Sequence, residues 1–165
     1  MTAWRRPRKP QLCAIAAALV LALGAVGLAA ARAQTTERIV VDRHTGLALY
    51  GVDPVAYFTN RRVMLGSADL EHRHAGAIWR FSNEGNRAAF MADPDVYMPR
   101  FGGYDPVGVA RGVSTAGFAE LWAVFNQRLY LFHSAESRRA FLADPSAAVA
   151  AATARWAEVR SELSP

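Results

Sequence analysis

Hydrophobic positions follow two different patterns along the chain. Residues 12–31 are apolar and uncharged without interruption, whereas after Gln34 short apolar stretches alternate with polar segments. Two of these stretches, residues 78–81 and 128–132, are short and rich in aromatic and aliphatic side chains, which predicts β-strands. Residues 38–42 have a similar character and predict a further strand.

A turn and a partner strand precede each of the two aromatic stretches. Ala75-Gly76 and Asn126-Gln127 are residue pairs suited to tight turns. The segments before these turns, residues 71–74 and 121–125, would pair with the strands that follow. We therefore expect two antiparallel β-hairpins.

The hydrophobic period changes to that of a helix after each hairpin. Asn83 and Ser134 are good helix N-caps, and the helices should continue to about Ala92 and Ala143. An Asp-Pro pair then stops each helix, because the residue before a proline is disfavoured in helical conformation. Each helix carries one phenylalanine that should bury it against its hairpin: Phe90 and Phe141.

An internal repeat relates these two sets of elements. Residues 79–94 and 130–145 match at a constant offset of 51. Upstream, Asp53-Pro54-Val55 is echoed by Asp105-Pro106-Val107 at an offset of 52. The first match is long and specific, whereas the second is short enough to arise by chance.

The predicted fold class is α+β, with two pseudo-repeated β-hairpin-plus-helix units and a C-terminal helix. The half-repeats span about residues 49–97 and 101–148, and residues 98–103 predict a loop because they contain one proline and two glycines. Residues 146–163 place apolar side chains near one helix face and predict the C-terminal helix. A single domain would cover residues 34–165.

The first 33 residues have the organisation of a signal peptide. A basic segment, residues 4–9, precedes the apolar stretch. At the end of that stretch Ala31-Arg32-Ala33 places small residues at the two key positions, the third and the first before a cleavage site ahead of Gln34. The segment could also remain as an uncleaved anchor. Arg5-Arg6 leaves open whether export follows the general secretory or the twin-arginine route. The predicted location is periplasmic or secreted.

Charge and cysteine content limit the classes of partner. The formal net charge of +5 arises before Gln34, because 14 Arg face 14 Asp and Glu in the rest of the chain. A neutral body has little attraction for phosphate backbones or anionic lipid. We therefore expect no nucleic-acid partner, and membrane contact only through an uncleaved N-terminal segment. Cys13 precedes the cleavage site, so the exported protein would have no thiol group. The expected partner is a periplasmic protein or a small ligand.

Several motifs together resemble the exported bacterial YHS-domain family. They are Gly51-Val52-Asp53-Pro54-Val55-Ala56-Tyr57-Phe58, Trp79-Arg80-Phe81-Ser82, Asn86-Arg87-Ala88-Ala89-Phe90, Ala92-Asp93-Pro94 and Phe101-Gly102-Gly103-Tyr104. The resemblance covers about residues 49–156. Domains of this family occur beside heavy-metal pumps and in some oxygenase subunits, so the resemblance implies a metal-handling module.

The sequence departs from the family pattern wherever that pattern has a cysteine. The residues at these positions are Ala56, Ser82 and Asn86 in the first half and Gly108, His133 and Ser137 in the second. Hydroxyl and amide groups are poor ligands for Cu(I) or Zn(II). The chain therefore resembles a cysteine-less, divergent member without a tight site for soft metals.

Four side chains are candidate metal ligands: His133, Asp105, His72 and His74. His133 could bind a metal with Asp105 or another histidine, or it could be a hydrogen-bonded histidine beside a helix start. His72 and His74 would lie about 7 Å apart on one strand face, which suits a Cu or Zn ion and equally a solvated hairpin edge. The expected cofactor is Cu or Zn, or no tightly bound metal.

Three functions agree with these features. The first is a non-enzymatic, exported YHS-domain binding or accessory protein, with metal handling implied by the resemblance. The second is a structural or protein-interaction domain whose metal site has been lost. The third is an enzyme with an aromatic-lined cleft and Asp105 or His133 as acid or base, although no nucleophile–base pair is evident. The aromatic residues that could form such a cleft, or a core instead, are Tyr50, Tyr57, Phe58, Trp79, Phe81, Phe101, Tyr104, Trp122 and Tyr130.

The signal sequence gives the first prediction. The exported protein should begin at Gln34, because the basic, apolar and small-residue segments occur in the order that signal peptidase requires. Intact-mass measurement of protein from a periplasmic extract checks this. A membrane-bound species that retains the N-terminal residues would show that the segment is an anchor.

Overall fold

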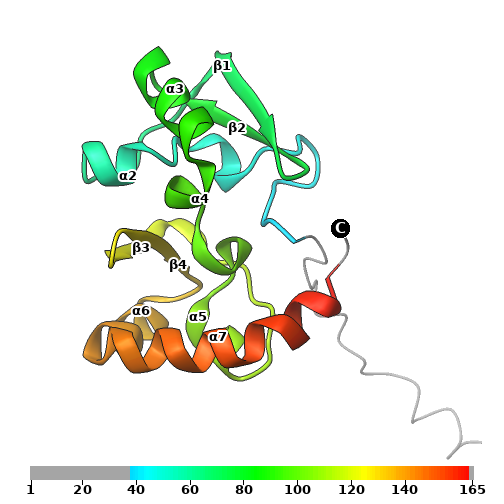
Figure 1. Ribbon diagram of the computed structural model, residues 1–165, viewed down its shortest axis with the longest axis vertical. Helices are drawn as coiled ribbons and strands as arrows, with labels where there is room; N and C mark the ends of the chain where they lie inside the picture. Colours follow the sequence, from blue (N-terminus) through cyan, green and yellow to red (C-terminus); the bar gives the residue numbers. More distant parts are fainter. Residues whose placement is uncertain (1–37, 164–165) are drawn as a thin grey trace, which may run out of the picture. The chain divides into compact units, whose positions relative to one another are not determined.

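The chain folds into two hairpin-and-helix halves (Figure 1). The computed structural model describes residues 38–163, which belong to one compact unit. The first half contains the 3₁₀ helix η1 (Leu49–Gly51), α2 (Ala56–Thr59), β1 (Ser67–His74), β2 (Ala77–Phe81), α3 (Glu84–Ala92) and α4 (Pro94–Tyr97). The second contains the 3₁₀ helix η2 (Arg100–Gly103), α5 (Pro106–Ala110), β3 (Phe118–Phe125), β4 (Arg128–Phe132), α6 (Ala135–Ala143) and α7 (Pro145–Ser161). The predicted α+β class is confirmed.

Both predicted β-hairpins are present. β1 pairs with β2 and β3 with β4, each in a two-stranded antiparallel sheet. Ala75 and Gly76 turn the first hairpin with φ angles of 51° and 81°, and Asn126 and Gln127 turn the second with 47° and 55°. Positive φ at both central residues gives a turn whose twist matches that of the strands. The predicted turn residues are therefore correct, although β1 and β3 begin earlier than expected.

Side-chain caps fix the start of the helix after each hairpin. Asn83 accepts a hydrogen bond from the backbone nitrogen of Asn86 at 2.8 Å, and Ser134 accepts one from that of Ser137 at 3.1 Å. α3 and α6 end at the predicted Asp-Pro pairs. Each proline then becomes the first residue of the next helix, α4 or α7, because that position needs no N–H partner.

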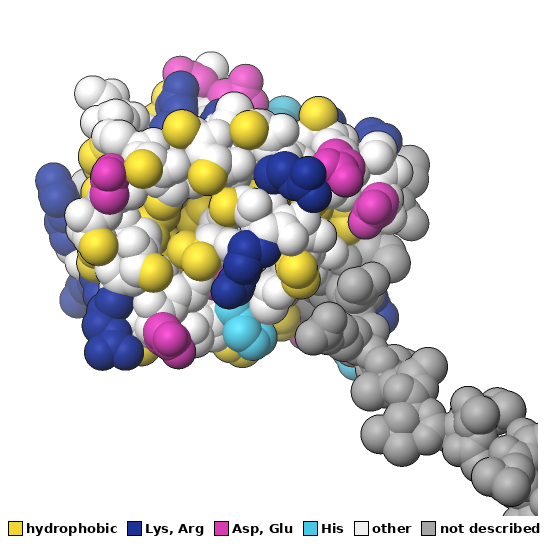
Figure 2. Space-filling model, turned by 90° about the horizontal axis from the view of Figure 1, so that it is seen from below, with side chains coloured by type: hydrophobic (Ala, Val, Ile, Leu, Met, Phe, Trp, Pro, Cys, Tyr) yellow, Lys and Arg dark blue, Asp and Glu magenta, His cyan; other side chains and the backbone are white. Residues whose placement is uncertain are grey.

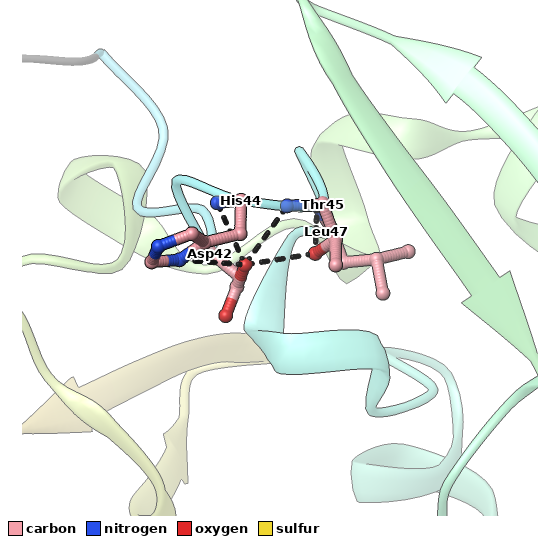
Figure 3. A network of polar contacts seen from close by, with 4 residues as sticks. All are labelled: Asp42, His44, Thr45 and Leu47. Atoms are coloured by element: carbon pink, nitrogen blue, oxygen red, sulfur yellow. Dashed lines mark hydrogen bonds and ion pairs between the residues drawn. The ribbon is translucent and has the colours of Figure 1, made fainter.

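Residues 38–42 do not form the predicted strand. Within this segment the β-pairing is limited to one isolated bridge, between Val41 and Ala48. Asp42 instead begins a tight turn. Its Oδ1 accepts hydrogen bonds from the backbone nitrogens of His44 and Thr45, both at 2.9 Å, and from Thr45 Oγ1 at 3.0 Å (Figure 3). This side-chain turn reverses the chain before a longer ladder can form.

Short helices account for the other differences from the prediction. Residues 98–103, predicted as a loop, contain η2, in which Phe101 and Gly102 adopt φ angles of 55° and 63°. The helix α2 follows the first Asp-Pro-Val motif and α5 begins at the proline of the second; neither was predicted. Helices of 4 or 5 residues are too short to display a hydrophobic period.

A phenylalanine fills the space between helix and hairpin in each half. Phe90 is fully buried, and its ring lies 5.0 Å from that of Trp79 and 5.2 Å from that of Phe81. Phe141 is equally buried and contacts the two aromatic rings at the equivalent positions of β4, at 4.9 and 5.1 Å. Most of the aromatic residues considered for a cleft lie in this core; of the nine, six are buried and Tyr50 is exposed.

Tyr57 joins the two halves. From α2 its hydroxyl donates a hydrogen bond to the carbonyl oxygen of Ala119 on β3 at 2.8 Å, and its ring meets that of Trp122 at 5.1 Å. Burial, with a smaller contribution from the charge of Glu120, raises the pKa of Tyr57, so the phenol keeps its proton and can donate. Hydrophobic side chains of both halves belong to one cluster around it.

The two halves match in the order of their elements and in local detail. Each passes through a 3₁₀ helix, a short α-helix, a hairpin and two further helices. Each hairpin has a shift of register at the same place, between Ser67 and Glu71 in the first and between Phe118 and Trp122 in the second. Their origin by duplication stays a prediction.

Surface charge is mixed on the face that carries α7. Figure 2 shows arginine, acidic and hydrophobic side chains interspersed there, as the balanced charge after Gln34 leads one to expect. Within residues 38–163 no helix is both long and apolar enough to cross a membrane. The predicted signal peptide, residues 1–33, and its cleavage site lie outside the described residues.

The second prediction concerns the two central phenylalanines. Phe90→Ala and Phe141→Ala should each lower the free energy of unfolding by about 3–5 kcal/mol, the usual range for a buried phenylalanine. Their neighbours Met91 and Leu142 are 53% and 46% exposed and provide matched controls. Met91→Ala and Leu142→Ala should cost about 0.5 kcal/mol or less. Urea denaturation measures all four, and equal losses in both pairs would contradict this core.

Candidate functional site

The structure brings two of the four predicted metal ligands together. Asp105 precedes α5, His133 follows β4, and the backbone nitrogen of His133 donates to Asp105 Oδ2 at 3.0 Å. His72 and His74 lie on β1 in the other half, with ring centroids 6.3 Å apart, and both rings contact Phe90. Among the described residues no hydrogen bond, ion pair or ring contact joins the β1 histidines to the other two. The four therefore do not form one cluster.

Asp105 is a buried carboxylate, only 3% exposed. Its Oδ1 accepts a hydrogen bond from the backbone nitrogen of Val107 at 2.9 Å and so caps α5. Its Oδ2 accepts the bond from His133, which fixes the end of β4 against the start of α5. An ionised carboxylate offers about four acceptor positions, so these two donors leave part of its capacity unused.

Ser137 provides a second buried polar group beside this carboxylate. The residue lies in the first turn of α6 and is 8% exposed, and its Oγ has no hydrogen-bond partner among the described residues. Asp105 and Ser137 both line a cavity of about 270 Å³. The other lining residues are Val107, Gly108, Arg111, Thr115, His133, Ser134, Glu136 and Ala140. We call this space the second-half cavity.

The imidazole of His133 is held at the rim of the cavity. Its Nδ1 lies 3.0 Å from the carbonyl oxygen of Ala116, and its ring stacks on that of Phe118 at 5.2 Å. Because a carbonyl oxygen only accepts, this contact places the ring proton on Nδ1. The Nε2 of the neutral ring is then an acceptor or a metal ligand.

The equivalent residues of the first half make a closed network. Asp53 is fully buried. Its Oδ1 accepts hydrogen bonds from the backbone nitrogens of Val55 at 2.9 Å and Ala56 at 3.3 Å. Its Oδ2 accepts bonds from Ser82 N at 2.8 Å, from Ser82 Oγ at 2.7 Å and from Asn86 Nδ2 at 2.7 Å. Five donors satisfy this carboxylate.

Two substitutions account for two of the three hydrogen bonds that Asp53 accepts and Asp105 lacks; the third is the bond from the backbone nitrogen of Ala56. The hydroxyl of Ser82 is replaced by the ring of His133, whose Nδ1 bonds elsewhere. The amide of Asn86 is replaced by the shorter hydroxyl of Ser137, which makes no hydrogen bond. The second-half cavity therefore combines a carboxylate with spare acceptor capacity and an unpartnered buried hydroxyl. Such a site can bind a group that donates hydrogen bonds.

A metal would find few ligands here. Nowhere in the part of the chain that the structure describes do three or more His, Cys, Asp or Glu side chains come close enough to hold an ion. In the cavity the available donors are His133 Nε2 and the carboxylates of Asp105 and Glu136, and the first of these carboxylates already serves as a helix cap. The histidine pair on β1 offers imidazole alone.

Sequence reasoning missed the role of the two aspartates and of Ser137. The signal was present: Asp53 and Asp105 repeat at an offset of 52, and Asn86 is matched by Ser137 at an offset of 51. A short motif that recurs beside a longer repeat is stronger evidence of a true match than the same motif would be by itself. The replacement of an amide by a hydroxyl at equivalent positions indicates where the two halves differ in chemistry.

Comparison of the chain with family models, curated proteins and solved structures gave no match. The site is therefore interpreted from its own geometry.

The third prediction concerns a substitution that would give the second half the hydrogen-bond network of the first. Ser137→Asn should raise the free energy of unfolding by about 1 kcal/mol, because an amide can donate to Asp105 and fill part of the cavity. The reverse change, Asn86→Ser, should lower it by about 1–3 kcal/mol, because it removes a donor from the buried carboxylate of Asp53. Urea denaturation measures both. If Ser137→Ala cost more than about 1 kcal/mol, Ser137 Oγ would have a partner and the cavity argument would fail.

Proposed function

We propose that the protein is an exported, non-enzymatic binding module of YHS type, and that the second-half cavity holds its ligand. One observation carries the proposal. Within residues 38–163, equivalent buried aspartates have five hydrogen-bond donors in the first half and two in the second, where the adjacent Ser137 Oγ is buried without a partner. Buried polar groups are nearly always hydrogen-bonded in folded proteins. A bound ligand would complete the hydrogen bonding of the cavity.

The chemistry of the lining defines the ligand. Asp105 and the Nε2 of His133 accept hydrogen bonds, and Ser137 can accept or donate. We propose a small organic molecule with N–H or O–H groups, of which an amine is favoured by the carboxylate charge. A volume of about 270 Å³ suits a molecule of a few heavy atoms.

The YHS resemblance supports a ligand site at this place. Three positions that carry cysteine in the family pattern, Gly108, His133 and Ser137, line the cavity. Loss of the thiolates removes the usual ligands for soft metals. Metal handling enters this proposal through His133 alone, whose imidazole could contribute to a weak Cu(II) or Zn(II) site.

A structural role is the second candidate function. The closed network around Asp53 indicates that the same scaffold positions can serve stability alone. In this case the cavity would be the remnant of a lost site, and the domain would act through its surface. The binding experiment below separates the two functions.

The fourth prediction tests the proposed ligand class. Calorimetric titration of the purified protein with ethanolamine, a small amine with an added hydroxyl, should give saturable binding with a Kd of about 1 mM or below. Ser137→Asn should weaken this binding about tenfold, because the new amide occupies the cavity and the carboxylate. Ser67→Asn makes the same change at an exposed serine of β1 and should have no effect.

Titration with Cu(II) and Zn(II) gives the contrasting result. We expect no binding tighter than micromolar, because the chain from Gln34 onward has no cysteine and His133 is the imidazole that lines the cavity. Nanomolar metal binding that is abolished by His133→Ala would show that the ligand of the cavity is a metal ion and not an organic molecule. Binding that is lost instead in His72→Ala or His74→Ala would move the site to β1. No binding of ethanolamine or metal by any variant would favour the structural role.

A further inference from the structure

Two hollows adjoin one another beside Trp156 of α7, away from the second-half cavity. Their volumes are about 580 and 410 Å³, and they share the lining residues Asp95, Met98, Pro99 and Trp156. We treat the two hollows as the two parts of one groove, and Trp156 lines both parts. We call it the Trp156 groove. Each part has the volume of a site for a small organic ligand.

Arginines line both parts of this groove. Arg38 and Arg160 line the larger hollow, and Arg100 and Arg128 line the smaller one. One acid, Asp95, lines both parts. Four positive charges against one negative charge contrast with the whole chain after Gln34, in which Arg and acidic residues are equal in number.

Among residues 38–163 none of these four arginines forms an ion pair with a carboxylate, although the guanidinium of Arg100 lies over the ring of Phe101, 5.7 Å from its centroid. The ion pairs between Arg and Glu among residues 38–163 involve Arg80, Arg87 and Arg155. Arg128 donates only to the neighbouring carbonyl oxygen of Gln127, at 3.4 Å. Guanidinium groups that are free of carboxylates are suited to bind the carboxylate of a ligand through paired N–H bonds.

The part that the two hollows share carries one acid, Asp95, and three apolar side chains, of which Trp156 is held in place by the core. The ring of Trp156 lies 5.6 Å from that of Phe101 and 6.4 Å from that of Tyr104, so two core side chains hold it in place. Pro99 is buried and Met98 partly exposed beside it. A half-buried indole with a thioether and a proline offers a surface on which a flat apolar group can lie.

From these features we infer that the Trp156 groove binds an elongated organic dianion, with an anionic group at each arginine pair and an apolar or aromatic body over Trp156. Each anionic group would gain charge-assisted hydrogen bonds from two arginines. The apolar body would remove water from the indole and from Met98. This site is separate from the second-half cavity, so the inference does not rest on the proposed function.

The fifth prediction tests this groove with terephthalate, a flat dianion with one carboxylate at each end. Calorimetric titration of the purified protein at about 0.02 M salt should show saturable binding that weakens as salt increases toward about 0.3 M. Benzoate has one carboxylate, and succinate has two but no ring. Each should bind more weakly than terephthalate, by about tenfold or more. Equal affinity for all three probes would overturn the inferred ligand class.

Two double variants examine the two parts of the groove separately. Arg38→Gln with Arg160→Gln, and Arg100→Gln with Arg128→Gln, should each weaken terephthalate binding about tenfold or more, because each removes one anion position. Arg62→Gln with Arg139→Gln removes the same charge from exposed positions outside both hollows and is the matched control. Circular dichroism establishes that all three remain folded.

Several outcomes would overturn the inference. They are terephthalate affinity that is unchanged in both groove variants, an equal loss in the control variant, and no terephthalate binding at low salt. An acidic peptide such as hexaglutamate provides the last arm. If the peptide binds and terephthalate does not, the groove recognises an acidic protein segment, and the small dianion is the wrong ligand.

Discussion

Each half of this protein depends on a buried aspartate. Asp53 and Asp105 stand before a short helix, accept backbone N–H bonds near its start through one carboxylate oxygen, and use the other to hold the residue that follows the hairpin. Removing a carboxylate from water is unfavourable unless donors replace the water. The aspartate therefore joins the short helix to the end of the hairpin in both halves, and in the first half it also holds the start of α3 through Asn86. The central phenylalanine of each half packs against the hairpin that the aspartate holds.

The same device has different chemical consequences in the two halves. In the first half Ser82 and Asn86 complete the hydrogen bonding of Asp53, and the network serves stability. In the second half a histidine and a shorter serine leave Asp105 with backbone donors only. An internal comparison of this kind is informative because both aspartates are buried before a short helix, while His133 and Ser137 stand where the first half has Ser82 and Asn86. It identifies the second-half cavity without reference to any other protein.

Charge in this protein is balanced overall and uneven locally. Equal numbers of Arg and acidic residues after Gln34 argue against long-range attraction to polyanions. Arginines at the Trp156 groove nevertheless outnumber the acid there, and they are drawn from four separate parts of the chain, the first near residue 38 and the last on α7. A net charge measures steering over a distance, whereas recognition of a small anion depends on the few side chains within hydrogen-bonding reach.

The sequence by itself determined the elements whose signals are local. Hairpin turns at Ala75-Gly76 and Asn126-Gln127, helix caps at Asn83 and Ser134, and Asp-Pro stops each depend on a few adjacent residues, so they could be predicted. The lack of a strand at residues 38–42 could not be predicted in this way. A strand needs a neighbouring strand to pair with, and the turn at Asp42 leads the chain away before such pairing forms. The contact of Asp105 with β4, the unpartnered hydroxyl of Ser137 and the grouping of four arginines around Trp156 join residues distant in sequence. Only tertiary packing decides such contacts, because the donors left to a buried group depend on which elements the fold places around it.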